Sequence, residues 1–195
     1  MAGPDALQRD SFGDSADVTD RRLAILARGG NSEAFDTLIE RHHASIFRLC
    51  WAMLCDRSDA EDAVQETFVR TYQSLPRYDT ERAFAPWLRG VAAKVCLQAL
   101  RRRSRHAQRQ SSLEDDFREP AAPEPPEVSQ LATDAVAALA ELNETYRLPL
   151  TLFYLHEASV AEVAEALGIS PGAARVRLHR GREQLKEMLM NDHER

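Results

Sequence analysis

A stretch of proline and acidic residues divides the chain, and no packed core can run through it. Between residues 107 and 128 lie Pro120, Pro123, Pro125 and Pro126, together with six carboxylates. Proline interrupts helices and central strands, and a segment rich in charge and poor in apolar side chains cannot bury enough surface to fold. The chain is therefore predicted to form two small domains joined by a flexible acidic linker.

On both sides of this linker, apolar residues recur at the three- and four-residue spacing of amphipathic helices, and no segment alternates like a strand. The prediction is an all-α fold. We expect a disordered tail at 1–17, a first helical domain at 18–106, the linker at 107–128 and a second helical domain at 129–193. No apolar run is long enough for a membrane span, and the polar N-terminus lacks the apolar stretch of a secretory signal, which indicates a cytoplasmic protein.

The first domain is expected to contain four helices. They are predicted at 18–30, from about 31 onward, from Ser58 to Pro76, and from about Phe84 to Arg103. Ser58 with Glu61 three residues later is the pattern of a capping box, which would start the third helix. The buried stripe of that helix is predicted to consist of Ala60, Val64, Phe68, Tyr72 and Leu75.

The second domain contains the signature of a helix-turn-helix. Ser159 and Glu162 form a second capping box, Gly168 ends the helix, and Ser170 followed by Pro171 starts another. A capped helix, a short glycine turn and a second capped helix are the layout of this DNA-binding motif.

The last helix has two unlike sides at 100° per residue. Ala174, Leu178, Gly181 and Leu185 share one side and are expected to pack. The opposite side is predicted to enter a DNA major groove, with Arg175 and Arg180 on guanine edges, Val176 on a thymine methyl, and His179 beside them. Arg177 and Arg182 lie on the flanks, where phosphate contacts are expected. The alternative is an ordinary solvated basic face.

The net charge of −6 alone argues against nucleic-acid binding, but the basic residues are clustered. One run lies at 101–109 and another at 175–186, so basic segments can still meet phosphate.

The three cysteines, Cys50, Cys55 and Cys96, fall in apolar helical patterns that suit reduced, buried thiols. A metal site using His42, His43, Cys50 and Cys55 is the alternative, although no CxxC or HxxxH pair supports it. No nucleophile arrangement, phosphate loop or cofactor motif is present. The sequence therefore predicts neither an enzyme nor a bound cofactor or small-molecule substrate.

Two blocks of sequence resemble a known family. The first reads DAEDAVQETF at 59–68, LPRYD at 75–79 and APWL at 85–88. The second runs from LNETYR at 142–147 through SVAEVAEALGIS at 159–170 to RLHRGR at 177–182. In this order and spacing they resemble regions 2 and 4 of the extracytoplasmic-function sigma factors of the sigma-70 family, which lack region 3.

The resemblance implies a role for each block. Asp62, Gln65 and Glu66 match the contact with the clamp coiled coil of RNA polymerase. The loop 77–83 and the fourth helix match the part that captures the opened −10 strand. Within it, the candidate DNA contacts are Arg77, Tyr78, Arg82, Lys94 and Arg101, whereas Phe84 and Trp87 are also candidates for the core. The recognition helix would read the −35 element.

The partners implied by the resemblance are core RNA polymerase, promoter DNA and an anti-sigma factor, often membrane-anchored, which would hold the chain at the inner membrane face. Two other classes remain open on the residues alone. A stand-alone helix-turn-helix regulator would bind promoter duplex without polymerase. An interaction module that mimics a sigma factor would lack the basic face on the last helix.

Overall fold

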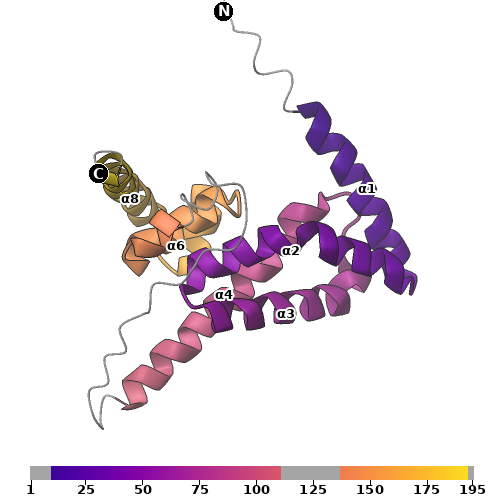
Figure 1. Cartoon of the computed structure of the whole chain (residues 1–195), viewed down its shortest axis with the longest axis horizontal. Helices are drawn as coiled ribbons and strands as arrows, with labels where there is room; N and C mark the ends of the chain where they lie inside the picture. Colours follow the sequence, from indigo (N-terminus) through magenta and orange to yellow (C-terminus); the bar gives the residue numbers. More distant parts are fainter. Residues whose placement is uncertain (1–9, 111–136, 193–195) are drawn as a thin grey trace, which may run out of the picture.

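The computed structural model describes residues 10–110 and 137–192, and every regular element in these two ranges is a helix (Figure 1). The all-α prediction is confirmed. In chain order the elements are α1 (Asp10–Arg28), α2 (Ser32–Leu54), α3 (Arg57–Ser74), η1 (Leu75–Arg77), α4 (Phe84–Gln110), α6 (Glu144–Tyr154), α7 (Val160–Leu167) and α8 (Pro171–Asp192). Residues 137–141 are also helical. We call α1–α4 with η1 the N-terminal bundle and residues 137–192 the C-terminal bundle. No helix in the described ranges combines the length and apolar character needed to cross a bilayer.

Two helices extend beyond their predicted ends. Helix α1 begins at Asp10, so the prediction of a disordered tail is wrong for residues 10–17, and residues 1–9 lie outside the described part. Acidic residues near a helix N-terminus are favoured by the helix dipole, and no proline interrupts this segment. Helix α4 continues to Gln110, because residues 101–110 consist largely of good helix formers. The rest of the predicted linker, 111–128, lies outside the described residues.

Helix α2 is the centre of the core. Its last six residues, 49–54, are all buried, which is the mark of a helix covered on every side. Helices α1, α3, α4 and α6 all pack against it. Trp51, in this buried stretch, is 1% exposed.

The turn between α2 and α3 differs in detail from the prediction. Cys55 adopts a left-handed conformation (φ 53°) that ends α2. Asp56 then caps α3, with its carboxylate accepting a hydrogen bond from the Asp59 amide at 2.9 Å. The predicted Ser58–Glu61 capping box is therefore wrong, because the capping residue lies two positions earlier and Ser58 is already inside the helix.

The buried stripe of α3 also needs one correction. Tyr72 is half exposed, and Thr71 is buried in its place. Steps of four residues drift around a helix with 3.6 residues per turn, so a stripe starting at Ala60 returns at position 71. The Thr71 hydroxyl donates to the Thr67 carbonyl at 2.7 Å, and the Thr67 hydroxyl donates to the Ala63 carbonyl at 2.6 Å. Both buried hydroxyls are thereby satisfied.

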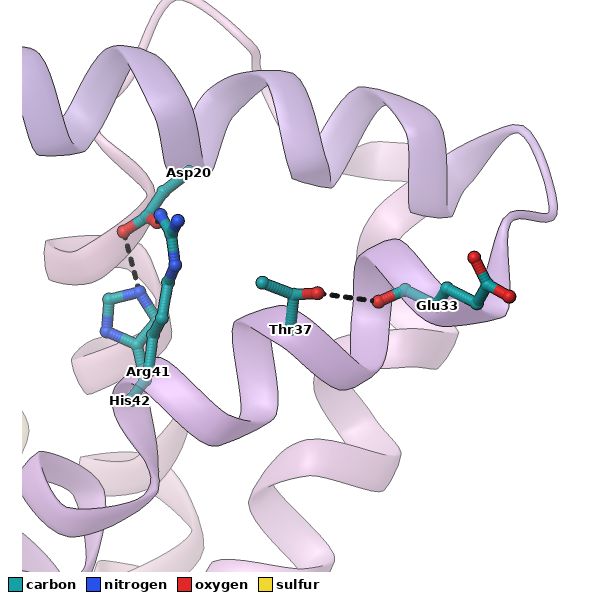
Figure 2. Close-up of polar contacts among 5 residues, drawn as sticks. All are labelled: Asp20, Glu33, Thr37, Arg41 and His42. Carbon is teal, nitrogen blue, oxygen red and sulfur yellow. Dashed lines mark hydrogen bonds and ion pairs between the residues drawn. The ribbon is translucent and has the colours of Figure 1, made fainter.

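Helix α1 is fastened to α2 by a buried carboxylate (Figure 2). Asp20 is 5% exposed, and its two oxygens lie 3.0 Å from Arg41 Nη1 and 2.7 Å from His42 Nε2. One turn earlier on α2, the Thr37 hydroxyl donates to the Glu33 carbonyl at 2.8 Å. A carboxylate without such partners would be costly to bury, so this contact sets where α1 docks.

The C-terminal bundle follows the predicted caps closely. Ser159 and Glu162 form the reciprocal capping box at the start of α7. Gly168, with φ at 65°, ends α7 in the left-handed conformation. The Ser170 hydroxyl then accepts from the Ala173 amide at 3.1 Å and starts α8. The predicted helix-turn-helix layout is confirmed, and α6 packs against both α7 and α8.

The two bundles also pack against each other, which the sequence pattern did not predict. Helix α2 contacts α6. Leu148, Leu152, Val163 and Ala164 of the C-terminal bundle belong to the same buried cluster as the core of the N-terminal bundle. The chain thus has two sequence-separated helical bundles whose apolar cores meet.

The packing of α6 on α8 predicts opposite effects for two glycine substitutions. A Cβ at Gly181 would lie 2.8 Å from Leu150 Cδ1 and 3.2 Å from Tyr146 Cβ, whereas one at Gly172 meets only Ser170 Oγ at 3.9 Å. Gly181→Ala should be less stable than the parent, because overpacking costs roughly 1–3 kcal/mol and outweighs the gain in helix propensity. Gly172→Ala should be equally or more stable.

Urea unfolding followed by circular dichroism would measure both free energies. Equal stability of the two variants would contradict the close approach of α6 and α8 at Gly181.

Candidate nucleic-acid interface

Helix α8 has one packed side and one open side. Ala174, Leu178 and Gly181 are buried against α6 and α7. The opposite side is exposed over its first three turns, where the side chains are Arg175, Val176, His179 and Arg180. Val176 is 51% exposed, which is unusual for a β-branched apolar residue unless it meets a partner. The structure therefore brings together all four residues that were predicted to read the −35 element.

The two flanking arginines are held more closely to the protein. Arg182 lies over the Phe153 ring, 5.7 Å from its centroid, and is otherwise exposed. Arg177 is half-buried. A stacked guanidinium still presents its N–H groups outward, and this geometry suits contact with a phosphate beside the groove.

A second surface lies on α3. Asp62, Gln65 and Glu66 are all exposed there, one helical turn apart, so the structure places them on one face. Glu66 Oε1 accepts from Arg70 Nε at 2.6 Å, and Arg70 Nη1 donates to Gln98 Oε1 on α4 at 2.7 Å. This chain of hydrogen bonds orients the Glu66 carboxylate and joins α3 to α4.

Two apolar residues that were not among the predicted site residues extend the α3 face. Val69 is 51% exposed and Tyr72 is 50% exposed, and they follow Glu66 at the spacing of one and two helical turns. The Tyr72 ring packs edge-on against Phe35, with centroids 5.0 Å apart. In the sequence, Val69 and Tyr72 continue the polar stripe of α3 at helical spacing. An apolar patch beside polar residues is typical of an interface that has an apolar centre and a polar rim.

The loop before α4 is built around a buried tyrosine. Tyr78 is 3% exposed, its ring lies 4.7 Å from Trp87 and 5.6 Å from Phe84, and its hydroxyl donates to the Arg82 carbonyl. In this structure the Tyr78 ring is not open to a DNA base. It fixes the shape of the loop that carries the exposed side chains of Arg77 and Arg82.

Three of the five predicted −10 residues line one cleft. Arg82, Lys94 and Arg101 border a cleft of about 550 Å³ together with Trp87 and Gln98. Its opposite wall belongs to the C-terminal bundle and consists of Leu152, His156, Ala158, Glu162, Glu165 and Ala166. Arg77 and Tyr78 are not part of this lining.

Two groups on the far wall of the cleft have shifted pKa values. Burial and the positive charge of Arg89 lower the pKa of His156. The hydrogen bonds that Ser159 makes in the capping box lower the pKa of Glu162, so this carboxylate is charged at neutral pH. The far wall therefore presents negative charge to the basic residues of α4.

The cysteines are structural in this fold. Cys50 and Cys96 are both 0% exposed, and the hydrogen bond between their thiols, together with burial, raises the pKa of Cys50 well above its ordinary value. Burial also raises the pKa of Cys55. A thiol with a raised pKa is a poor nucleophile and a poor metal ligand.

The metal alternative has no support in the described part of the chain, where no three His, Cys, Asp or Glu side chains gather. Of its four candidate ligands, His42 is paired with Asp20, and His43 stacks on Phe68 with ring centroids 6.4 Å apart.

Comparison with known proteins covers both bundles. Residues 38–106 match the family model for Sigma-70 region 2, and residues 133–185 match the model for Sigma-70 region 4. The chain is 35% identical over 162 residues to the RNA polymerase sigma factor CarQ of Myxococcus xanthus, an alignment that spans 83% of this chain and 92% of CarQ. It is 34% identical over 161 residues to the ECF RNA polymerase sigma factor SigE of Mycolicibacterium smegmatis, and it spans 62% of that longer protein.

Two solved structures have a similar fold. One is CnrH in complex with the cytosolic domain of CnrY, with a TM-score of 0.57, 28% sequence identity, and coverage of 89% of this chain and 99% of that one. CnrH of Cupriavidus metallidurans is itself a sigma factor. The other is the sigma factor RpoE in complex with the anti-sigma factor NepR from Bartonella quintana, with a TM-score of 0.61, 22% identity, and coverage of 80% and 96%.

Proposed function

Since the chain belongs to the sigma-70 family as an extracytoplasmic-function sigma factor, and is thus a transcription initiation factor and not an enzyme, we propose that it binds core RNA polymerase and directs it to promoters. The main observation in support of promoter recognition is that α8 has two unlike sides. Its inner side is buried, and its outer side presents basic and apolar groups at the end of a capped helix-turn-helix.

The −35 element would be read by the open side of α8. Arg175 and Arg180 have the length and the N–H geometry to pair with the O6 and N7 atoms of guanine. Val176 can pack on a thymine methyl, and His179 lies between the two arginines on the same side. Arg177 and Arg182 would hold the DNA backbone and fix the register of the helix in the groove.

Core polymerase would bind the exposed face of α3. Asp62, Gln65 and Glu66 supply its polar part, and Val69 and Tyr72 supply apolar area beside it. The family resemblance implies that the partner is the clamp coiled coil of RNA polymerase, and an acidic face of this kind favours a partner surface of positive charge. Because Arg70 and Gln98 hold Glu66 in place, little side-chain entropy is lost when a partner docks.

The opened −10 strand would bind along α4 and the loop before it. Arg82, Lys94 and Arg101 offer positive charge at intervals along one side, and Arg77 adds charge from the loop. Positive charge with aromatic neighbours is the usual composition of a single-strand site. We assign Tyr78 the role of positioning this loop, because its ring is buried against Trp87.

An anti-sigma factor is the proposed regulator. The described residues contain two helical bundles and no separate sensor domain, and the similar structure of CnrH contains the cytosolic domain of a second protein, CnrY. We propose that the chain acts in the cytoplasm and that a membrane-anchored anti-sigma factor holds it at the inner membrane face. An amphipathic helix between the bundles would cover both the α3 face and part of the C-terminal bundle.

A run-off transcription assay with core polymerase tests the function as a whole. Promoter-specific transcripts that depend on this protein are expected. Tight binding to promoter duplex without any polymerase-dependent transcript would instead favour a stand-alone helix-turn-helix regulator. Polymerase binding without recognition of DNA would favour an interaction module.

Charge reversal on α3 should weaken polymerase binding without unfolding the protein. We expect the double variant Asp62→Lys/Glu66→Lys to lose at least tenfold in affinity for core enzyme, or about 1.4 kcal/mol, measured by fluorescence anisotropy. The matched control is Asp36→Lys/Glu40→Lys, which has the same residue types and spacing on an exposed part of α2. Equal affinities of the two double variants would show that the α3 face is wrongly assigned.

Substitutions on α8 should separate base reading from phosphate contact. Arg175→Ala or Arg180→Ala should cost about 1–3 kcal/mol and relax the preference at one base pair. Arg182→Ala should weaken all sequences alike and lower the salt dependence. Competition binding with a library of −35 duplexes would measure both effects, and a uniform loss from all three variants would mean that α8 contacts only phosphates.

Hydrogen exchange should locate the anti-sigma factor. In a purified complex with the regulator, amides of α3 and of the C-terminal bundle are expected to exchange more slowly than in the chain alone. Protection limited to residues 1–17 and 111–128 would contradict this arrangement, as would full activity of the factor in cells that lack any repressor.

A further inference from the structure

The side-chain amide of Gln98 lies between two of the basic residues that the proposed function assigns to the −10 element. Lys94, Gln98 and Arg101 are exposed at spacings of four and three residues, so they form one stripe along α4. All three also border the same cleft. A neutral amide between two cations adds little attraction for phosphate, but amides are groups that distinguish one base edge from another.

The Gln98 side chain is held from the neighbouring helix. Arg70 Nη1 donates to Gln98 Oε1 at 2.7 Å, and Nε of the same guanidinium donates to Glu66 Oε1 at 2.6 Å. Helices α3 and α4 pack against each other, so both ends of this bridge stand on fixed elements. A planar guanidinium bonded through two of its nitrogens has a fixed direction. Glu66 therefore orients Arg70, and Arg70 orients Gln98.

The chemistry of Arg70 decides which end of the Gln98 amide faces away from α3. An arginine side chain has only hydrogen-bond donors, so the atom of Gln98 that meets it must be the oxygen. The Gln98 Nε2 group has no hydrogen-bond partner among the described residues. Its two N–H groups are thus directed away from Arg70 and are free to donate to a ligand.

A glutamine held in this way can donate to a base but is badly placed to accept from one. A free glutamine pairs with adenine in both directions, accepting from N6 and donating to N7. With its oxygen turned toward α3, Gln98 loses half of that pairing. It suits a base edge that only accepts, such as the N7 and O6 atoms of guanine.

We propose that Arg70 is a positioning residue for promoter recognition: it holds Gln98 so that only the amide N–H groups face the −10 element, and this sets a preference against adenine at the base that Gln98 meets. The location of the −10 element along α4 rests on the proposed function, whereas the hydrogen-bonded bridge does not.

The bridge contributes orientation more than stability. The side chains of Arg70 and Glu66 are 30% and 47% exposed, and ion pairs with such exposure add little to the free energy of folding. Arg70→Ala is therefore expected to keep the melting temperature of the parent, measured by circular dichroism. A change in base preference in this variant can then be separated from a loss of fold.

Selection from a promoter pool tests the positioning role. Holoenzymes assembled from core RNA polymerase and each variant would bind duplexes randomised across the −10 element, and sequencing of the bound fraction would give the preference at each position. Each preference is a ratio among bases bound by the same holoenzyme, so a change in affinity for core enzyme cancels. Arg70→Ala should raise the share of adenine relative to guanine at one position by roughly five- to tenfold. Gln98→Ala should lose the preference at that same position.

Two further variants separate orientation from charge. Arg57→Ala is the matched control, because Arg57 Nε donates to Glu61 Oε1 at 2.9 Å in a pair with the same four-residue spacing that joins residues of α3 only. It should select the same sequences as the parent. Gln98→Glu keeps an oxygen for Arg70 but has no N–H group, so it should turn the preference at the same position toward bases with an amino group, cytosine and adenine.

The outcomes distinguish the positioning role from the proposed function. A parent holoenzyme that selects no −10 sequence would refute the proposed function, and the role of Arg70 with it. A parent that selects a −10 sequence, together with an Arg70→Ala variant of identical preference at every position, would overturn the positioning role alone. Uniformly weaker binding of all sequences by Arg70→Ala would also overturn it, as would a change at a position that Gln98→Ala leaves unaltered, because a role in charge or packing alone predicts these results.

Discussion

The burial of α2 is the constraint on which the rest of the structure depends. Residues 49–54 are covered on every side, so helices from both bundles must pack there. A helix that is apolar all round cannot stand at a surface, and two short bundles of this size each have little core of their own. Sharing the C-terminal end of α2 gives both bundles a common core, with Leu148 and Leu152 in the same cluster as Trp51.

The proposed functional surfaces are the helix faces that this packing leaves exposed to solvent. On α8, contact with α6 at Gly181 buries one side and turns Arg175 and Arg180 outward. On α3, burial of Val64 and Phe68 leaves Asp62 and Glu66 exposed on the other face. In each helix the recognition face is the side opposite the buried stripe. A substitution in the stripe would therefore rotate or shift the recognition face as well as lower the stability of the fold.

The side of α4 proposed for the −10 element differs from the other two surfaces, because polar bonds to a neighbouring helix orient part of it. Arg70 donates to Glu66 within α3 and to Gln98 on α4. One guanidinium thus joins the face proposed for polymerase to the side proposed for promoter DNA. The direction of the Gln98 amide is set by another helix, so it does not follow from the spacing of residues along α4.

The sequence by itself determined the features that depend on near neighbours. The caps at Ser159 and Ser170, the glycine stop at Gly168 and the two-sided α8 all rest on residues within one helical turn of each other. Those predictions hold because a cap or a stripe is a local hydrogen bond or a local periodicity. The misplaced stripe position at Tyr72 was an error of the same local kind, which an exact count of 3.6 residues per turn corrects.

The tertiary structure alone decided which faces meet across long separations. Tyr78 was a candidate DNA contact because an aromatic ring can stack on a base. Its ring is buried instead, because Phe84 and Trp87 pack against it. The thiols of Cys50 on α2 and Cys96 on α4 contact each other. Arg101 donates a hydrogen bond to the Ala166 carbonyl, although the two residues lie on opposite sides of the linker in the sequence. No spacing rule encodes such contacts. They arise when helices choose partners by the shape and total area of their apolar faces, and that choice is made by the whole packed core at once.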